Sequence, residues 1–432
     1  MGDPEQRRLA RVIADSCAHG DHLRVNKQML RAALGFALVL LGAVRPPIQP
    51  RIDAQVLLVI ANGVAHGARL ANALAGSLPA GRTRNVIADR RLASPDAEAL
   101  NGLSTVHAPG LAPRSVWRIS SFARLGEYLR LRRALGARAP RYSSSRFYDE
   151  YVFLAQALRF LLAMDVVPTT AGLMVCDFDR DAYSSPWLWA CERLGIPTVT
   201  AVHGTPSALT YLPLLAETVL AWGAVQRAWF TQLAPGVRAT LAGRPDIASR
   251  VPVAGAVERV IICHSREELK PSEATRLADL AERYRRSGVE CVLRLHPTAA
   301  EPVGAGWNMV AAQCRVEVVG FEPLSESLVR GDFVVGVVTS ALIDALIDGY
   351  PVAVFADPER PLPADIAAIA EYSRERSFVG RDMRYLPSGY VEALNALSHT
   401  LVDAVGEESQ ERIRDLLDRL VDGDRKSVDE VG

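Results

Sequence analysis

The sequence lacks the cysteine patterns of a disulfide-stabilised or metal-stabilised protein. Its six cysteines form no CxxC pair and no framework spacing; they stand at positions 17, 176, 191, 263, 291 and 314. Most of them lie within apolar runs, where a reduced core thiol is the usual state. The cysteine pattern therefore favours a cytoplasmic location.

The sequence also lacks net charge and long apolar runs. Lys plus Arg and Asp plus Glu both number 49, so no global charge points to nucleic acid as a partner. The first residues are polar and show no secretory signal, and the apolar run 32–44 is too short to span a bilayer. This run predicts a packing helix; the alternative is an interfacial helix whose basic flanks hold the protein at the inner face of the plasma membrane.

What the sequence does contain is length and a regular alternation of strand and helix patterns. A chain of 432 residues is too long for one ordinary core and predicts two domains of roughly 200 residues each. Aliphatic strands such as 56–60 and 260–263 are each followed by a turn and a helical pattern. The alternation predicts an α/β fold with two Rossmann-like doubly wound domains that face a cleft.

Clusters of proline and glycine, which interrupt helix and strand patterns, predict the boundaries of these domains. The expected segments are a helical extension 1–50, a first Rossmann-like domain 51–235, a linker 236–257, a second Rossmann-like domain 258–421 and a polar tail 422–432. Gly63 and Gly67, after the first strand, do not complete a GxGxxG fingerprint, so the sequence does not support dinucleotide binding.

The stretch 196–230 organises the first candidate site. Its apolar run 197–202 predicts a buried parallel strand that ends abruptly at His203, in the turn His203-Gly204-Thr205-Pro206. Ligands bind at the carboxyl ends of such strands. A near-neutral pKa suits a histidine to take the proton of an acceptor hydroxyl. The structural alternative is a turn histidine that bonds to local backbone.

Two aspartates, Asp177 and Asp179, follow the predicted strand 173–176. Carboxylates in this position serve as acid/base groups, as metal ligands or as helix N-caps. Because Ser184-Ser185-Pro186 already provides a cap for the next helix, at least one of the two aspartates is expected to orient His203 or to act as the base itself. No His, Cys or acidic cluster predicts a metal site.

In the second domain, the strand 291–295 ends in Arg294-Leu295-His296-Pro297, and Thr339-Ser340 precedes the helix 341–348. The free N–H groups at a helix start favour a phosphate. His296 is expected to donate to the leaving nucleotide's phosphate, and Arg294 joins it if the strand stays regular. The structural alternative for His296 is again a turn histidine.

Residues 114–141 are strongly basic, with eight arginines against one acid, Glu127. Such clusters attract phosphates or acidic polymers, so we expect Arg130, Arg132 and Arg133, together with His66 after the first strand, on the acceptor side. The alternative is a solvated amphipathic helix.

Two short motifs resemble those of known families. HGTP at 203–206 and RLHP at 294–297 resemble the pair found in CDP-glycerol glycerophosphotransferases of teichoic acid synthesis. RLHP and the downstream VVGVVTSALIDALIDGYPVAVF resemble the HP and serine motifs of bacterial polysialyltransferases and related capsule enzymes. With Trp222-Gly223 between them, the motifs stand in the expected order over roughly 170–360, although Thr339-Ser340 replaces the serine pair.

This resemblance implies a GT-B glycosyltransferase that moves a sugar or polyol-phosphate from a CMP- or CDP-activated donor to an anionic cell-surface polysaccharide or glycolipid. It implies an acceptor role for the first domain and a nucleotide role for the second, with no cofactor and no required metal. Two alternatives stay open. A non-hydrolysing nucleotide-sugar 2-epimerase shares the fold but needs further acids in the cleft, and a GT-B-like protein could bind nucleotide without catalysis.

Overall fold

The computed structural model describes the C-terminal part of the chain almost continuously and the N-terminal part in pieces. The described residues are 55–60, 70, 73–78, 84–88, 104–107, 122–135, 150, 153–154, 156–157, 160–161, 163–164, 167, 170–179, 184–265, 267–296, 299–319, 324–375 and 384–422. The predicted extension 1–50, His66, Pro297 and nearly all of the predicted polar tail lie outside them.

The first sheet is wholly parallel. Its strands are β1 (Val56–Ile60), β2 (Arg84–Ala88), β3 (Ser104–His107), β4 (Leu173–Cys176), β5 (Thr198–Ala201), β6 (Thr218–Ala221) and β7 (Arg238–Leu241). They are arranged in the order β3-β2-β1-β4-β5-β6-β7. The order reverses between β1 and β4, which is the doubly wound pattern. Continuous aliphatic runs such as β1 are fully buried, as expected for a parallel sheet covered on both faces.

The described helices of this domain are α5 (Phe122–Leu135), α7 (Ser185–Leu194), α8 (Ala208–Tyr211) and α9 (Ala224–Leu233). Helix α7 has Pro186 in its first turn and ends at Gly195, whose φ of 70° is the left-handed cap that the glycine predicts.

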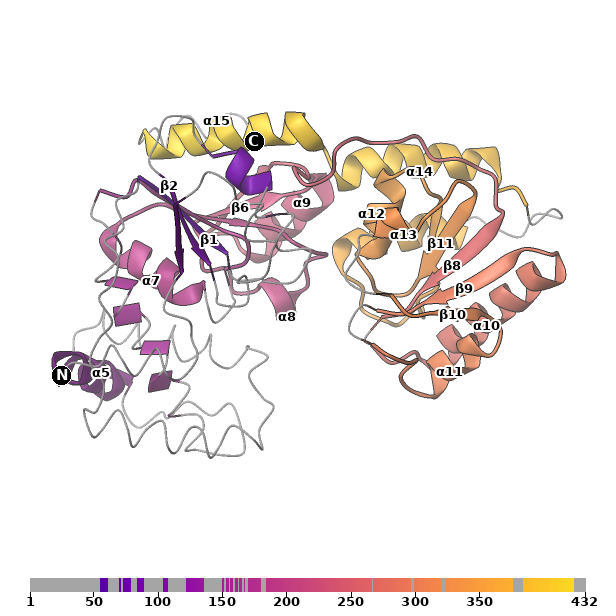
Figure 1. Cartoon of the computed structure of the whole chain (residues 1–432), viewed down its shortest axis with the longest axis horizontal. Helices are drawn as coiled ribbons and strands as arrows, with labels where there is room; N and C mark the ends of the chain where they lie inside the picture. Colours follow the sequence, from indigo (N-terminus) through magenta and orange to yellow (C-terminus); the bar gives the residue numbers. More distant parts are fainter. Residues whose placement is uncertain are drawn as a thin grey trace.

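The second sheet repeats the same plan. Its strands are β8 (Arg259–Cys263), β9 (Glu290–Arg294), β10 (Arg315–Glu317), β11 (Asp332–Gly336) and β12 (Val352–Val354), in the order β10-β9-β8-β11-β12. The connecting elements are α10 (Pro271–Arg286), α11 (Ala305–Ala311), the short helix η3 (Leu324–Glu326), α12 (Ala341–Ile347), α13 (Ala364–Glu375) and α14 (Ser388–Leu401). Figure 1 shows the two domains side by side.

Two segments belong to the first domain although the sequence predicted otherwise. The predicted linker 236–257 contains β7, which pairs with β6 as the edge of the first sheet; its half-exposed residues give little hydrophobic pattern. The last helix, α15 (Gly406–Val421), was predicted within the second domain. Its residues Ile413, Leu416 and Leu420 pack in the same core cluster as β1, and Figure 1 shows α15 lying across the first domain.

The chain crosses between the domains through close backbone contacts. A Cβ at Gly223 would lie 2.5 Å from the carbonyl of Leu401 at the end of α14. The crossing is fixed by bonds from Asp403 N to Trp222 O (2.9 Å) and from Arg244 N to Ala404 O (2.8 Å). The packing therefore explains the glycine of the Trp222-Gly223 motif, because only a residue without a Cβ lets the two backbones come this close. In the described ranges, no helix has the length and apolar character needed to cross a membrane.

Candidate functional site

A small cavity lies between the two domains. The first domain and its crossing segment contribute Leu70, Val202, His203, Trp222, Arg244 and Asp246, and α12 of the second domain contributes Ser340, at its N-cap position, and Asp344. Its volume is about 30 Å³, which is room for one or two water molecules. The structure thus brings His203 and Ser340, predicted from separate motifs, to the same space.

His203 directly follows the buried end of β5 and is held by Tyr211. The backbone N–H of His203 donates to Tyr211 Oη at 3.1 Å, and Oη lies 3.1 Å from His203 Nδ1. The ring of Phe178 packs edge-on against the imidazole, with centroids 4.5 Å apart. Ser207, which caps α8 through its bond with Thr210, sets the short helix that delivers Tyr211.

The bond between Tyr211 and His203 can run in two directions, one for each tautomer of the imidazole. Burial raises the pKa of Tyr211 far above its ordinary value, so the phenol keeps its proton. The phenol can donate its hydrogen to Nδ1 or accept a hydrogen from it at 3.1 Å. The predicted role as a base requires the second direction, with the hydrogen on Nδ1 and with Nε2 as the basic nitrogen.

The two predicted aspartates are buried within the first domain and do not line the cavity. Asp179 is fully buried, and its Oδ2 accepts the backbone N–H groups of Leu215 (2.6 Å) and Ala216 (3.2 Å). Asp177 is also fully buried. The carboxylate of Asp179 therefore organises the turn that leads into β6.

The capping argument that left these aspartates for catalysis is corrected by the structure. Ser184 makes no cap bond to α7. Its hydroxyl donates instead to the carbonyl of Phe178, and the Ser185 hydroxyl donates to the carbonyl of Asp179 at 3.0 Å. The serines thus stabilise the same turn as Asp179.

On the second domain, Arg294 and His296 of the predicted RLHP motif do not line the cavity. Arg294 is buried and donates to the Ser327 hydroxyl next to η3, which indicates a structural role. His296 is half-buried and is not among the cavity-lining residues. It follows the end of β9, next to the switch point between β8 and β11, where doubly wound sheets bind ligands.

Sequence reasoning missed His264, which directly follows β8 at this switch point. The side chain is only 4% exposed and packs on Trp307, with ring centroids 4.7 Å apart. Neither ring nitrogen has a hydrogen-bond partner among the described residues. Burial, and to a lesser extent the nearby His296, lowers the pKa of His264, so the imidazole is neutral at neutral pH. Its position at the end of a predicted strand was the available signal.

Sequence reasoning also missed the charged group of the cavity, Arg244, because it lies in the stretch read as linker. Its Nε and Nη2 donate to both carboxylate oxygens of Asp246 at 2.8 Å, and Nη1 donates to Asp344 Oδ1 at 2.9 Å. The guanidinium carbon lies 4.2 Å from the centre of the Trp222 ring. Burial alone would lower the pKa of Arg244, but the two carboxylates outweigh it and raise the pKa.

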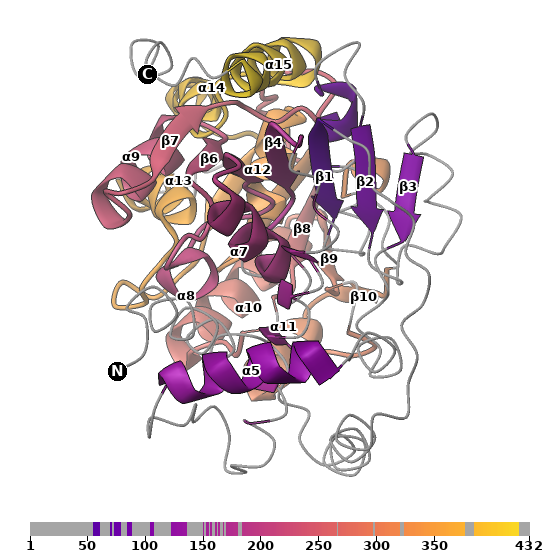
Figure 2. The same cartoon turned by 90° about the vertical axis from the view of Figure 1, so that its left-hand side faces the viewer.

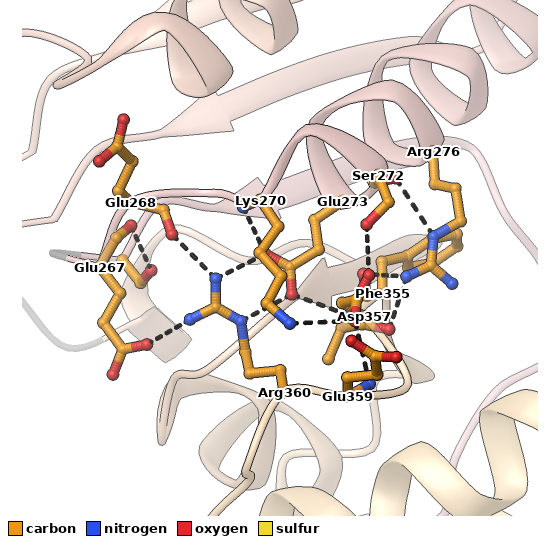
Figure 3. A network of polar contacts seen from close by, with 12 residues as sticks. Glu267, Glu268, Lys270, Ser272, Glu273, Arg276, Phe355, Asp357, Glu359 and Arg360 are labelled. Carbon is orange, nitrogen blue, oxygen red and sulfur yellow. Dashed lines mark hydrogen bonds and ion pairs between the residues drawn. The ribbon is translucent and has the colours of Figure 1, made fainter.

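A polar network braces the carboxyl edge of the second sheet (Figure 3). Glu273, in the first turn of α10, is fully buried and accepts from Arg360 Nε at 2.6 Å and Nη2 at 2.7 Å. It also accepts the backbone N–H groups of Lys270 (2.9 Å) and Asp357 (2.8 Å). The network ties the loop after β12 to the start of α10 and so fixes the end of the loop that follows β8.

The described part of the arginine-rich stretch, residues 122–135, does not reach the cavity. Figures 1 and 2 place α5 at the side of the first domain that is turned away from the second. Arg132 forms a two-bond ion pair with Glu150, at 2.8 and 2.5 Å. Arg130 and Arg133 are exposed. A surface role is therefore compatible with these side chains, whereas a place beside His203 is not.

Comparisons with known proteins leave the function open. No family model matches the sequence, and no curated protein matches it. The fold is similar to a glycosyltransferase from Rickettsia africae ESF-5, with 11% identity, coverage of 87% of this chain and 98% of that chain, and a TM-score of 0.43. It is also similar to a UDP-GlcNAc 2-epimerase from Neisseria meningitidis, with 12% identity, coverage of 87% and 99%, and a TM-score of 0.42.

These superpositions are too loose to bear on function, and the architecture rests on the strands themselves. Two doubly wound parallel sheets, a cavity between them and a last helix that returns to the first sheet form the GT-B arrangement. The predicted fold class, two Rossmann-like domains facing a cleft, is confirmed.

Proposed function

We propose that the protein is a GT-B transferase that moves a sugar or polyol-phosphate from a nucleotide-activated donor to a glycan acceptor. The observation that carries the proposal is the interdomain cavity, which joins His203 from the carboxyl end of β5 with Ser340 from the start of α12. Carboxyl ends of doubly wound strands are where such folds bind ligands. A site made by both domains can hold donor and acceptor together.

The second domain is the proposed donor side. His296 and His264, at the ends of neighbouring strands, would donate to the phosphate of a CMP or CDP group, and Ser340 would add a hydroxyl with Thr339 beside it. Imidazole N–H groups and hydroxyls stabilise developing phosphate charge through their hydrogen bonds. Among the described residues no group of three metal-ligating side chains is gathered, and the proposed contacts need no cation.

The first domain is the proposed acceptor side. His203, with its Nδ1–H donating to Tyr211 Oη, would hold the attacking hydroxyl and take its proton on Nε2. The exposed Arg130 and Arg133 would attract an anionic polysaccharide or glycolipid, or the inner face of a membrane that carries it. Masking of these charges by salt should weaken acceptor binding, because exposed charges are screened beyond about 8 Å at physiological ionic strength.

A nucleotide panel tests the donor. Titration with CMP, CDP, UDP and GDP, followed by thermal unfolding, should single out one nucleotide; at 100 times its Kd it should stabilise the fold by about 2.7 kcal/mol. His296→Ala should then reduce transfer by roughly ten- to a thousandfold, the range for losing one charge-stabilising donor. A parent protein that binds none of the four nucleotides would contradict the proposal.

One observation favours the epimerase alternative, namely the two carboxylates, Asp246 and Asp344, in the cavity. Both accept hydrogen bonds from Arg244 in this structure, which lowers their value as acid and base. Incubation with UDP-GlcNAc in the absence of an acceptor distinguishes the two functions, because an epimerase would form the 2-epimer and a transferase would not.

A further inference from the structure

We propose that Arg244 is the anion-binding residue of the interdomain cavity, and that a phosphate group bound there replaces Asp344 on its guanidinium. This inference rests on the proposed function, since it names the group that would receive the donor's phosphate. Among the residues that line the cavity, Arg244 carries the one permanent positive charge.

The guanidinium is oriented by its own domain. Asp246, two residues further along the chain, occupies Nε and Nη2, and the face of Trp222 supports the planar group at 4.2 Å, a favourable cation–π distance. Neither contact involves the second domain. The remaining contact, from Nη1 to Asp344, is the one that crosses between the domains.

Burial decides which carboxylate an incoming anion displaces. The Asp246 side chain is 4% exposed, whereas the Asp344 side chain is 18% exposed. A charge at the surface loses its partner at a smaller cost than a buried one. Asp344 can therefore turn toward solvent, while Asp246 stays with the arginine.

The neighbouring groups suit a phosphate. Ser340 precedes Asp344 by four residues on the same helical face, and both line the cavity with Arg244. Arginine binds phosphate oxygens through short charge-assisted hydrogen bonds, so a doubly charged phosphate can compete with the singly charged Asp344 for Nη1.

Calorimetric titration with inorganic pyrophosphate at constant ionic strength tests the exchange without a choice of nucleobase for the donor. Asp344→Asn keeps a hydrogen-bond acceptor for Arg244 but removes the competing charge, so pyrophosphate should bind roughly tenfold more tightly, equivalent to about 1.4 kcal/mol. Arg244→Lys, which cannot form the planar fork, should bind at least about tenfold more weakly. Cytidine, which has no phosphate, should show neither change.

Asp403→Asn is the matched control. Asp403 is partly exposed, pairs with Arg412 near the domain crossing and does not line the cavity. Asp403→Asn removes one carboxylate charge, as Asp344→Asn does, but should leave the affinity for pyrophosphate unchanged.

The outcomes separate the two proposals. Unchanged or weaker pyrophosphate binding in Asp344→Asn, or no pyrophosphate binding in the parent and in Asp344→Asn, would overturn the exchange. If Asp344→Asn binds pyrophosphate more tightly while no nucleotide is bound or transferred, the exchange stands and the proposed transferase function fails. If nucleotide transfer proceeds but Asp344→Asn and Asp403→Asn bind pyrophosphate alike, the function stands and the exchange fails.

Discussion

The Nε2 of Gln226 in the first domain donates a 2.7 Å hydrogen bond to the Oδ2 of Asp365 in the second. Gln226 in turn accepts the backbone N–H of Trp222 at 2.9 Å. Asp365 is fully buried, and burial raises its pKa from 3.8 to about 7, against a smaller lowering by Gln226. A titratable carboxyl thus lies inside the contact between the domains, beside a Tyr211 phenol that stays protonated.

Asp365 should make the fold less stable as the pH rises from about 4 to 7. In the unfolded chain the carboxyl loses its proton near 4, while in the folded protein it keeps the proton up to about 7. Over this interval the folded state binds more protons, so the free energy of unfolding falls with rising pH, by at most roughly 4 kcal/mol over the three units. Above pH 7 the loss is complete.

Asp365→Asn should remove this dependence and keep the acceptor for Gln226. We expect the variant to gain stability over the parent between pH 5 and pH 8, as measured by thermal unfolding at both values. Asp403→Asn, at a partly exposed carboxylate, serves as the control. Parallel pH curves for the parent and Asp365→Asn would contradict the assignment.

Tyr211→Phe should move the pH dependence of transfer. The phenol oxygen accepts the Nδ1 hydrogen of the tautomer that can act as a base and stabilises the imidazolium that forms, so its loss should shift the rise in turnover to lower pH and reduce turnover by roughly ten- to a hundredfold. A matching measurement is the ¹⁵N spectrum of the imidazole, in which the parent should show the Nδ1–H form. A Tyr211→Phe variant with the parent's pH profile would separate the tyrosine from the histidine's function.

Gly223→Ala and Gly204→Ala make the same change in two motif glycines with opposite expected results. The new Cβ at position 223 would lie 2.5 Å from the Leu401 carbonyl, whereas at position 204 no atom lies within 4 Å. We expect a loss of roughly 3 kcal/mol or more at Gly223, because backbone has to move, and a change within about 0.5 kcal/mol at Gly204. Equal denaturant midpoints would refute the close approach.

Glu273→Gln should destabilise the protein by roughly 3 kcal/mol at pH 7, since it removes the buried carboxylate charge that pairs with the guanidinium of Arg360. Burial tends to raise the pKa of Glu273, but the bonds from Arg360, Asp357 N and Lys270 N outweigh it and lower the pKa. The stabilisation is therefore present above the unfolded pKa and is lost as the pH falls through the lower folded value. The difference from the parent should shrink below about pH 4.

Glu282→Gln is the matched control for this charge, because its partner Arg286 is exposed. A surface pair of this kind contributes about 0.5 kcal/mol or less. Similar losses in the two variants, measured by urea unfolding, would show that the network in Figure 3 contributes no more than a surface ion pair.

Local sequence patterns were enough to predict the secondary-structure elements and the fold class. Continuous aliphatic runs such as Val56–Ile60 form strands buried on both faces, and Gly195 ends α7 in the left-handed conformation. His203 and Ser340 could be predicted as site residues for the same local reason: each directly follows a buried strand or precedes a helix, and the parallel topology then places both at a carboxyl edge.

Tertiary structure decided the contacts that join distant segments. The sequence shows that Asp179 follows a strand, but only the fold brings the N–H groups of Leu215 and Ala216 to its carboxylate and makes it structural. Arg244 was hidden in a stretch of weak pattern, because half-exposed edge residues such as those of β7 carry little periodicity. Its pairing with Asp344, 100 residues away, depends on how two separately folded sheets meet, and local sequence does not encode that relation.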